Sequence, residues 1–304
     1  MQNGFPVDLL PLLACPADGA ALHVNTSAAR MVDGTVTCTV CRSHYPIRDG
    51  LLCVIAPDTL HHESALEMRK RDQKATESAA AQREEWSSPF AEVGEVAPTL
   101  DAVQLAPGFT VAELGCGTGR YTMRLLERAR AVVAVDFSRA SLLRLRERLP
   151  ADTNVVLLQA DVTHPVLARR QFDRVLSTLH SNLPTANHRR QSLAVAAAAI
   201  RDDGRCVISM HHYGLRTLLA GEPAAGCYSD SGIFRQHLRQ HEARAEADRH
   251  FGTVTFTYLH ATIPGIRNIT LSRFAREIPI VRSSLSRLFL AVCKQPKRSA
   301  GESH

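Results

Sequence analysis

The 304-residue sequence has no uninterrupted apolar run of about 18 residues, the length that a membrane-spanning helix needs. Its first residues, MQNGFPVDLLPLLACP, also lack the basic start and long apolar core of a secretory signal peptide. We therefore expect no membrane association and a cytoplasmic location.

Aromatic residues are scarce as well, at 5% of the chain with one tryptophan. Proteins that bind single-stranded RNA stack bases on aromatic rings, and this composition offers little material for that. The net charge is +6, but the basic residues are scattered through helix-like stretches such as RLLERAR and SLLRLRERL. That pattern is typical of solvated helix faces, so an RNA-binding surface is an alternative rather than the leading expectation.

The eight cysteines are unevenly spread, and three of them, Cys15, Cys38 and Cys41, lie in the first 41 residues. In a chain without an export signal, such a cluster favours a metal site over disulfides. The other five lie in strand or loop patterns, and we expect buried, inert thiols: Cys53, Cys116, Cys206, Cys227 and Cys293.

Three zones follow one another along the chain. Residues 1–57 are rich in turns and end in YPIRDGLLCVIAP, which predicts two short strands around a turn at Asp49-Gly50. Residues 58–100 begin with HHESALEMRKRDQKATESAAAQREEW, whose strong helix formers predict one connecting helix before a looser SSPFAEVGEVAP. We expect them to form a small domain, a helical linker and, over residues 101–304, a catalytic domain.

The third zone alternates short apolar strands with helical segments. FTVAEL, AVVAVDF, NVVLLQAD, FDRVLSTL and GRCVISM are expected strands, and segments such as RYTMRLLERA and SRASLLRLRERL are the helices between them. This rhythm predicts a parallel, doubly wound α/β sheet. Two further strands, GTVTFTYLHATI and LSRLFLAVCKQ, lie close together near the end, so one of them could run antiparallel.

A glycine-rich loop, ELGCGTGRYT, follows the first of these strands. Gly115 and Gly117 allow a tight turn and close approach to a ligand, and Gly119 is expected to begin a helix whose amides face that ligand. The spacing is E-x-G-x-G-x-G, rather than the dinucleotide pattern G-x-G-x-x-G or a P-loop. Glu113, beside the loop, would repel a pyrophosphate and suits a ligand with positive charge or hydroxyl donors.

The loop and the motifs after it resemble class I S-adenosylmethionine-dependent methyltransferases. VAELGCGTGRYT, VVAVDFS, LLQADVT, FDRVLSTLHSNLPT and IRDDGRCVISM occur in the family's order. The resemblance implies a Rossmann-like seven-stranded sheet, with Asp136 on the cofactor's ribose and Asp161 near its adenine amino group. The expected S-adenosylmethionine-binding residues are Glu113, Gly115, Gly117, Gly119, Asp136, Phe137, Asp161, Val162 and Thr178.

The N-terminal cysteines lie in segments that resemble the zinc-ribbon domain of the Trm112 type. The family pattern C-P-x-C continues into C-x-x-C and YPI, but here Asp18 replaces the second cysteine. Because zinc also accepts carboxylate oxygen, a structural zinc site of Cys15, Asp18, Cys38 and Cys41 is expected. His23 or His44 could replace Asp18 as the fourth ligand, and the ribbon could alternatively have lost its metal.

The substrate is the least legible part of the sequence. Candidates for a catalytic base are His211, His212 and Tyr228, with His180, Asn182 and Tyr213 nearby in the motifs. Arg71, on the linker helix, is expected near the methionine carboxylate of the cofactor. SNLPT lacks the aromatic residue found after this motif in base-methylating relatives, so we expect a small-molecule or peptide-like acceptor. The alternatives are an RNA methyltransferase and a non-catalytic subunit whose ribbon docks a partner protein.

Overall fold

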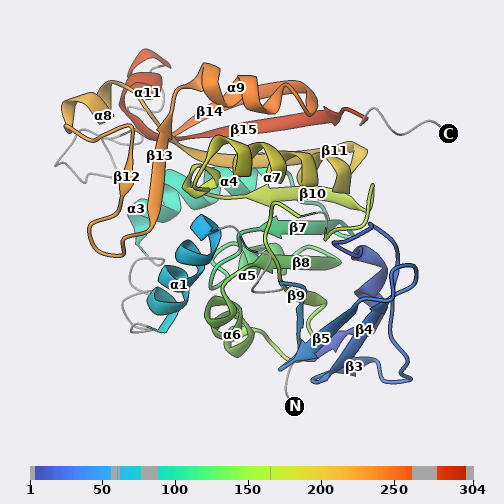
Figure 1. Cartoon of the computed structure of the whole chain (residues 1–304). Coiled ribbons are helices and arrows are strands. Elements are labelled where there is room, and N and C mark those ends of the chain that lie inside the picture. Colours follow the sequence, from blue (N-terminus) through green and yellow to red (C-terminus); the bar gives the residue numbers. More distant parts are fainter. Residues whose placement is uncertain are drawn as a thin grey trace.

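A computed structural model of the chain describes residues 4–55, 60, 62–76, 88–164, 166–261 and 279–298. Figure 1 shows a central sheet flanked by helices, with the N-terminal small domain at one edge. Within the described residues, no helix is long and apolar enough to cross a membrane.

Seven strands of a 13-stranded sheet form its central part, in the spatial order β9-β8-β7-β10-β11-β15-β14, and we call these seven the central sheet. The first five run parallel, and β15 runs antiparallel between β11 and β14. The strand bounds are β7 Thr110–Leu114, β8 Ala131–Asp136, β9 Val155–Gln159, β10 Phe172–Ser177, β11 Ile200–His212, β14 Phe251–Ala261 and β15 Ser286–Pro296. The predicted doubly wound, seven-stranded α/β sheet is confirmed, together with the antiparallel strand near its edge.

Two apolar clusters lie on the two faces of this sheet. Within β8, Val133 and Val135 belong to one cluster, and Val132 and Ala134 to the other, since successive side chains of a strand point to opposite faces. This double burial explains why the strands read as unbroken apolar runs. The flanking helices are α4 Ala97–Val103, α5 Thr122–Leu125, α6 Arg139–Arg148, α7 Ala186–Ala199 and α9 Gln240–Ala247, with a short η4 at His180–Asn182.

The small domain is a compact antiparallel arrangement that continues the central sheet. Its elements are β1 Phe5–Pro6, η1 Val7–Leu12, β2 Leu22–His23, β3 Arg30–Met31, β4 Gly34–Cys38, β5 His44–Arg48 and β6 Leu51–Cys53. The predicted pair of strands around Asp49-Gly50 is present as β5 and β6. β6 then pairs in parallel with β9, with Leu51 opposite Leu157, so the small domain covers the β9 edge of the central sheet.

The connecting zone is helical in two parts. Helix α1 spans His62–Thr76, and the rest of the predicted helix, over 77–87, lies outside the described residues. The segment expected to be loose is instead helical, with α3 Pro89–Ala91 and η3 Glu92–Val96 leading into α4. Gly94 and Pro98 lower helix propensity there, but packing of Val96 and Val103 under the sheet outweighs that preference.

The segment after β11 contains a hairpin that the sequence did not predict. Its strands are β12 Ala225–Cys227 and β13 Phe234–Leu238, which precede α9, and β13 pairs with the end of β11. Helices α8 Leu215–Leu219 and α11 Pro279–Leu285 lie in the same region. Residues 262–278, between β14 and α11, lie outside the described residues.

Candidate active site

A cavity of about 290 Å³ opens beyond the carboxyl ends of β7, β8 and β10. The glycine loop, α1, η3 and the segment after β10 all contribute to its wall. Seven of the nine residues predicted to bind the cofactor line it: Gly115, Gly117, Asp136, Phe137, Asp161, Val162 and Thr178. This is the edge at which doubly wound sheets bind their ligands.

Asp136 is an acidic residue of the cavity wall whose carboxylate is held by two backbone amides. Its two carboxylate oxygens accept hydrogen bonds from the backbone amides of Gly117 and Ser138, both at 2.8 Å. Burial raises the pKa of this carboxyl, while the two amide donors oppose that shift. The φ angle of Gly117 is +54°, so the loop conformation that presents its amide to Asp136 favours glycine.

Asp161, after β9, has one satisfied and one unsatisfied carboxylate oxygen. Oδ1 accepts hydrogen bonds from the backbone amide and the hydroxyl of Thr163, at 2.9 and 2.8 Å. Oδ2 is buried and has no hydrogen-bond partner among the described residues. A buried acceptor without a donor is costly in the free protein, so this oxygen suits a ligand that brings an N–H group.

Two arginines that line the cavity have nitrogens without a hydrogen-bond partner among the described residues. Arg71 of α1, which we expect near the methionine carboxylate of the cofactor, lines the cavity. Its Nε is buried without a hydrogen-bond partner among the described residues. Arg120, which the sequence analysis missed, directs one nitrogen to Glu95 at 3.3 Å, while its Nε and Nη2 have no partner in that part of the chain. The signal for Arg120 was its position directly after the last glycine of the loop.

Glu113 and Gly119 belong to the motif, but neither lines the cavity. Glu113 is 1% exposed and accepts a hydrogen bond from the hydroxyl of Thr122 at 2.6 Å. A Cβ on Gly119 would lie 2.3 Å from the side chain of Leu145, so this glycine permits close packing of the loop on α6. Helix α5 is also a single turn, shorter than predicted, which weakens the expected contribution of its amides.

Burial of Glu113 predicts a pH-dependent stability. Its pKa rises from 4.5 to about 8, chiefly through desolvation and against the hydrogen bond from Thr122. Because the folded protein disfavours the ionised form, stability falls as pH rises from the unfolded pKa through the folded one. We expect the free energy of unfolding of Glu113→Gln, relative to the wild type, to increase between pH 5 and pH 8 by up to about 1.4 kcal/mol per unit. Urea unfolding of both proteins measures this difference, and a constant difference across that range would contradict it.

The candidate bases His211 and Tyr228 form a pair just outside the cavity lining. The Tyr228 hydroxyl lies 2.7 Å from His211 Nε2, and His211 Nδ1 lies 2.9 Å from the hydroxyl of Ser181. Burial lowers the pKa of His211 to about 3, so its ring is neutral. His212 instead contacts the carbonyl of Ser286 and packs edge-on against Phe289, which is a structural environment.

Of the other residues proposed near the acceptor, two line the cavity. His180 is buried with both ring nitrogens engaged, by Ser177 and by the carbonyl of Arg189. Asn182 also lines the cavity, and its Oδ1 is buried without a partner among the described residues. Tyr213 stacks under Arg239 instead. Leu179 lies between these motifs with φ of +52°, an unusual conformation for leucine and one that is common beside binding sites.

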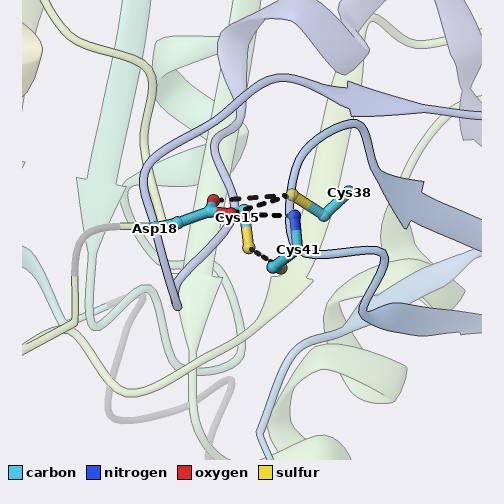
Figure 2. A group of neighbouring side chains, drawn as sticks. All are labelled: Cys15, Asp18, Cys38 and Cys41. Atoms are coloured by element: carbon cyan, nitrogen blue, oxygen red, sulfur yellow. Dashed lines mark hydrogen bonds between the residues drawn. The ribbon is translucent and has the colours of Figure 1, made fainter.

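Figure 2 shows that Cys15, Asp18, Cys38 and Cys41 converge from two turns of the small domain. Their candidate ligand atoms all lie within 4.8 Å of one another. The sulfurs of Cys15 and Cys41 are 3.6 Å apart, and the Asp18 carboxylate accepts from Cys38 at 3.4 Å and from the Cys41 amide at 3.1 Å. His44 contacts Thr37 and His23 is exposed, so the structure groups Asp18 with the cysteines rather than either histidine.

The remaining cysteines are not uniformly buried, contrary to the expectation for them. Cys116, Cys206 and Cys293 are buried, but Cys53 is half-buried and Cys227 is exposed. Cys227 ends β12, a strand of the hairpin that the sequence analysis did not foresee. Its exposure makes it a useful control thiol for experiments on the N-terminal group.

Two segments of the chain match families of known proteins. Residues 111–204 match the family described as methyltransferase domain, and residues 7–50 match the family described as Trm112p-like protein. The sequence is 27% identical over 128 residues to a probable ribosomal RNA small subunit methyltransferase A from Methanosarcina mazei, covering 42% of this chain and 44% of that protein. The chain therefore spans less than half of that relative's length.

Two solved structures share the fold. One is a complex between the Trm112 methyltransferase activator of Haloferax volcanii and its candidate methyltransferase, with TM-score 0.54, 16% identity, and coverage of 75% of this chain and 98% of that one. The other is an S-adenosylmethionine-dependent methyltransferase from Mesorhizobium loti, with TM-score 0.51, 19% identity, and coverage of 70% and 100%. The chain thus resembles the Trm112p-like family over residues 7–50 and the methyltransferase domain family over residues 111–204, and it shares its fold with S-adenosylmethionine-dependent methyltransferases.

Proposed function

We propose that this protein transfers the methyl group of S-adenosylmethionine to a small-molecule or peptide-like acceptor. The observation that carries the proposal is the set of unsatisfied polar atoms in one cavity. Oδ2 of Asp161 and nitrogens of Arg71 and Arg120 are buried without a partner among the described residues, and all three side chains line the same cavity as the glycine loop. A hydrogen-bond acceptor and cationic donors in one cavity suit a ligand with an amino group and a carboxylate.

Six of the residues that line the cavity would then hold the cofactor. Asp136 would accept from the ribose hydroxyls, and Asp161 Oδ2 from the adenine amino group. Phe137 and Val162 would contact the adenine, while Arg71 and Arg120 would bind the methionine carboxylate through charged hydrogen bonds. The proposed role of Glu113 and Gly119 is indirect, because they support the loop from behind.

When bound, the cofactor supplies an activated methyl group, so the protein contributes chiefly proximity and orientation. Helices α1 and η3 contribute Ser64, Glu67 and Glu95 to the wall of the cavity. Burial raises the pKa of the Tyr228 phenol, so Tyr228 would orient the acceptor through a hydrogen bond in its neutral form rather than remove a proton from it. His211 would act as a positioning residue, because burial keeps its ring a poor proton acceptor.

Calorimetric titration with S-adenosylmethionine tests the proposal. The wild type should bind one equivalent, and an absence of heat at several temperatures would overturn both this function and any other methyltransferase function. Several temperatures are needed because a binding enthalpy can vanish at one of them.

RNA methylation is the second candidate, and the names of the curated relatives favour it. They are described as ribosomal RNA methyltransferases and as dimethyladenosine transferases. Against this stands Leu183-Pro184-Thr185, which offers no aromatic ring to stack a base. Binding of bulk RNA, measured as a function of salt concentration, distinguishes the two proposed functions. An RNA methyltransferase should bind RNA with an affinity that falls steeply as salt rises, because the contacts are with phosphates.

We also propose that Cys15, Asp18, Cys38 and Cys41 hold a structural zinc ion. Three sulfurs and one carboxylate are an acceptable tetrahedral donor set, and four protein ligands leave no open position for catalysis. The buried apolar residues of the small domain, such as Leu9, Val36 and Ile47, belong to the same cluster as those of the central sheet, and a small domain without a separate core is the usual setting for a structural metal.

A further inference from the structure

Helix α1 forms part of the wall of the cofactor cavity and lies next to α6 (Figure 1). The residues of α1 that line the cavity are Ser64, Glu67, Arg71, Lys74 and Ala75. Their spacing, mostly three or four residues, places them on one face of the helix. A ligand in the cavity would therefore contact α1 along about three turns.

The contacts that hold α1 in place are polar. None of its 15 residues, all of which the structure describes, belongs to either apolar cluster of the sheet, and Leu66 is 47% exposed. The carboxylate of Glu67 accepts a hydrogen bond from the backbone amide of Phe234 at 3.2 Å, and the Ser64 hydroxyl lies 3.4 Å from His188 Nε2. A helix held by hydrogen bonds rather than by buried apolar surface separates at a low cost in free energy. Helix α1 therefore has the contacts of a segment that can open and close.

Asp72 joins α1 to the loop that carries Asp136, the residue proposed to hold the ribose. One carboxylate oxygen of Asp72 accepts hydrogen bonds from the Ser138 hydroxyl at 2.7 Å and from the backbone amide of Ala140 at 3.1 Å. The backbone amide of Ser138 in turn donates to Asp136 at 2.8 Å. Ser138 therefore connects α1 with the proposed ribose-binding carboxylate through two hydrogen bonds.

The position of Asp72 at the N-terminal end of α6 favours a carboxylate. Ser138 is the N-cap residue of this helix, and its hydroxyl oxygen accepts from the backbone amide of Ser141 at 3.1 Å. The amide of Ala140, in the first turn, has no acceptor inside the helix, and Asp72 supplies one. The negative charge of Asp72 also interacts favourably with the positive end of the helix dipole. These groups lose the carboxylate whenever α1 moves away.

Arg71 precedes Asp72 on α1 and lines the cavity. Its Nε is buried without a hydrogen-bond partner among the described residues, and it is proposed to bind the methionine carboxylate of the cofactor. Docking of Asp72 on Ser138 therefore fixes the backbone next to a donor for one end of the cofactor, while Asp136 would hold the ribose. Cofactor binding and docking of α1 then stabilise each other, because each orders groups that the other uses.

We propose that Asp72 is a positioning residue whose contact with Ser138 and Ala140 holds α1 closed over bound S-adenosylmethionine, so that release of S-adenosylhomocysteine requires this contact to break. This inference rests on the proposed function, because it takes the cavity as the S-adenosylmethionine site. The contact should affect the lifetime of the complex more than the rate at which it forms, since it is complete only after α1 has closed.

The test measures association and release of radiolabelled S-adenosylhomocysteine by the full chain. Asp72→Ala should raise the release rate constant about tenfold, the loss expected for a hydrogen-bonded carboxylate, and change the association rate constant less than about twofold. Asp72→Asn keeps one acceptor oxygen and should restore part of the lifetime. Asp101→Ala is the matched control, because Asp101 is exposed on α4 and does not line the cavity.

Hydrogen exchange gives a readout that a purely structural role of Asp72 would not change. Saturating S-adenosylhomocysteine should slow exchange of the amides over residues 62–76 in the wild type, and this protection should be smaller in Asp72→Ala at equal saturation. If Asp72 only caps α6, exchange over residues 139–148 would rise in the free variant while the ligand protected α1 as in the wild type.

Four results would overturn the proposal. They are an unchanged release rate constant in Asp72→Ala, a loss of affinity that lies entirely in association, equal protection of α1 by the ligand in both proteins, and no protection of α1 in the wild type. The last result needs no variant, so it decides the question even if Asp72→Ala does not fold. Failure of the proposed function is seen separately, as absence of S-adenosylhomocysteine binding to the wild type.

Discussion

Cys38→Ser is expected to release the metal from the small domain and to lower the free energy of unfolding by about 2 kcal/mol or more, or about 5 °C in melting temperature. The reason is that Cys38 is fully buried and one of four converging ligands, so a hydroxyl in its place leaves an incomplete donor set. Elemental analysis should give about one zinc per wild-type chain and less in the variant. Chelation of the wild type should reproduce the loss of stability.

Cys227→Ser is the matched control for this experiment. Cys227 is an exposed thiol in the hairpin, so the substitution should change neither metal content nor melting temperature. A wild-type protein that is purified without metal, takes up none from excess zinc, and melts identically with and without chelator would refute the zinc proposal.

Asp136→Ala is expected to weaken binding of S-adenosylhomocysteine by about 1–3 kcal/mol, which corresponds to roughly five- to 150-fold in affinity. The carboxylate lies in the cavity wall between the amides of Gly117 and Ser138, which fix its orientation. Calorimetry at pH 7 measures the loss.

A cofactor analogue separates this direct role from a disturbance of the loop. S-adenosylhomocysteine without its ribose hydroxyls should bind the wild type more weakly, and Asp136→Ala should then cause little further loss. Equal losses for the two ligands would show that Asp136 acts by holding the loop. An unchanged affinity for both would remove it from the site.

The sequence was most informative where a motif is local. The loop from Glu113 to Gly119, and Asp136 at the end of the next strand, could be located because strand, turn and helix signals coincide there. The separate roles of these residues could not be predicted from the sequence. The side chain of Glu113 points to the face that packs on α5, and Gly119 meets Leu145 of α6, and both contacts are tertiary.

Elements defined by packing were harder to predict. The β12–β13 hairpin has short strands with few β-branched residues, and its pairing with β11 is long-range. The contact between the Tyr228 hydroxyl and His211 brings together the hairpin and β11, and no spacing in the sequence indicates it. The candidate metal ligands could be grouped from the sequence because they occupy two tight turns. The choice between Asp18 and the histidines as the fourth candidate depends on the path of the backbone, which the sequence does not give.

The parallel pairing of β6 with β9 has a consequence for how the chain folds during synthesis. About a hundred residues separate these strands, so at typical translation speeds β6 emerges from the ribosome about 5–20 seconds before its partner. Until then Leu51 and Leu52, which are fully buried in the finished protein, can pair with β5 but lack β9 on their other side. Early metal capture by the preceding turns would hold this strand in a folded unit during that interval and limit its association with other nascent chains.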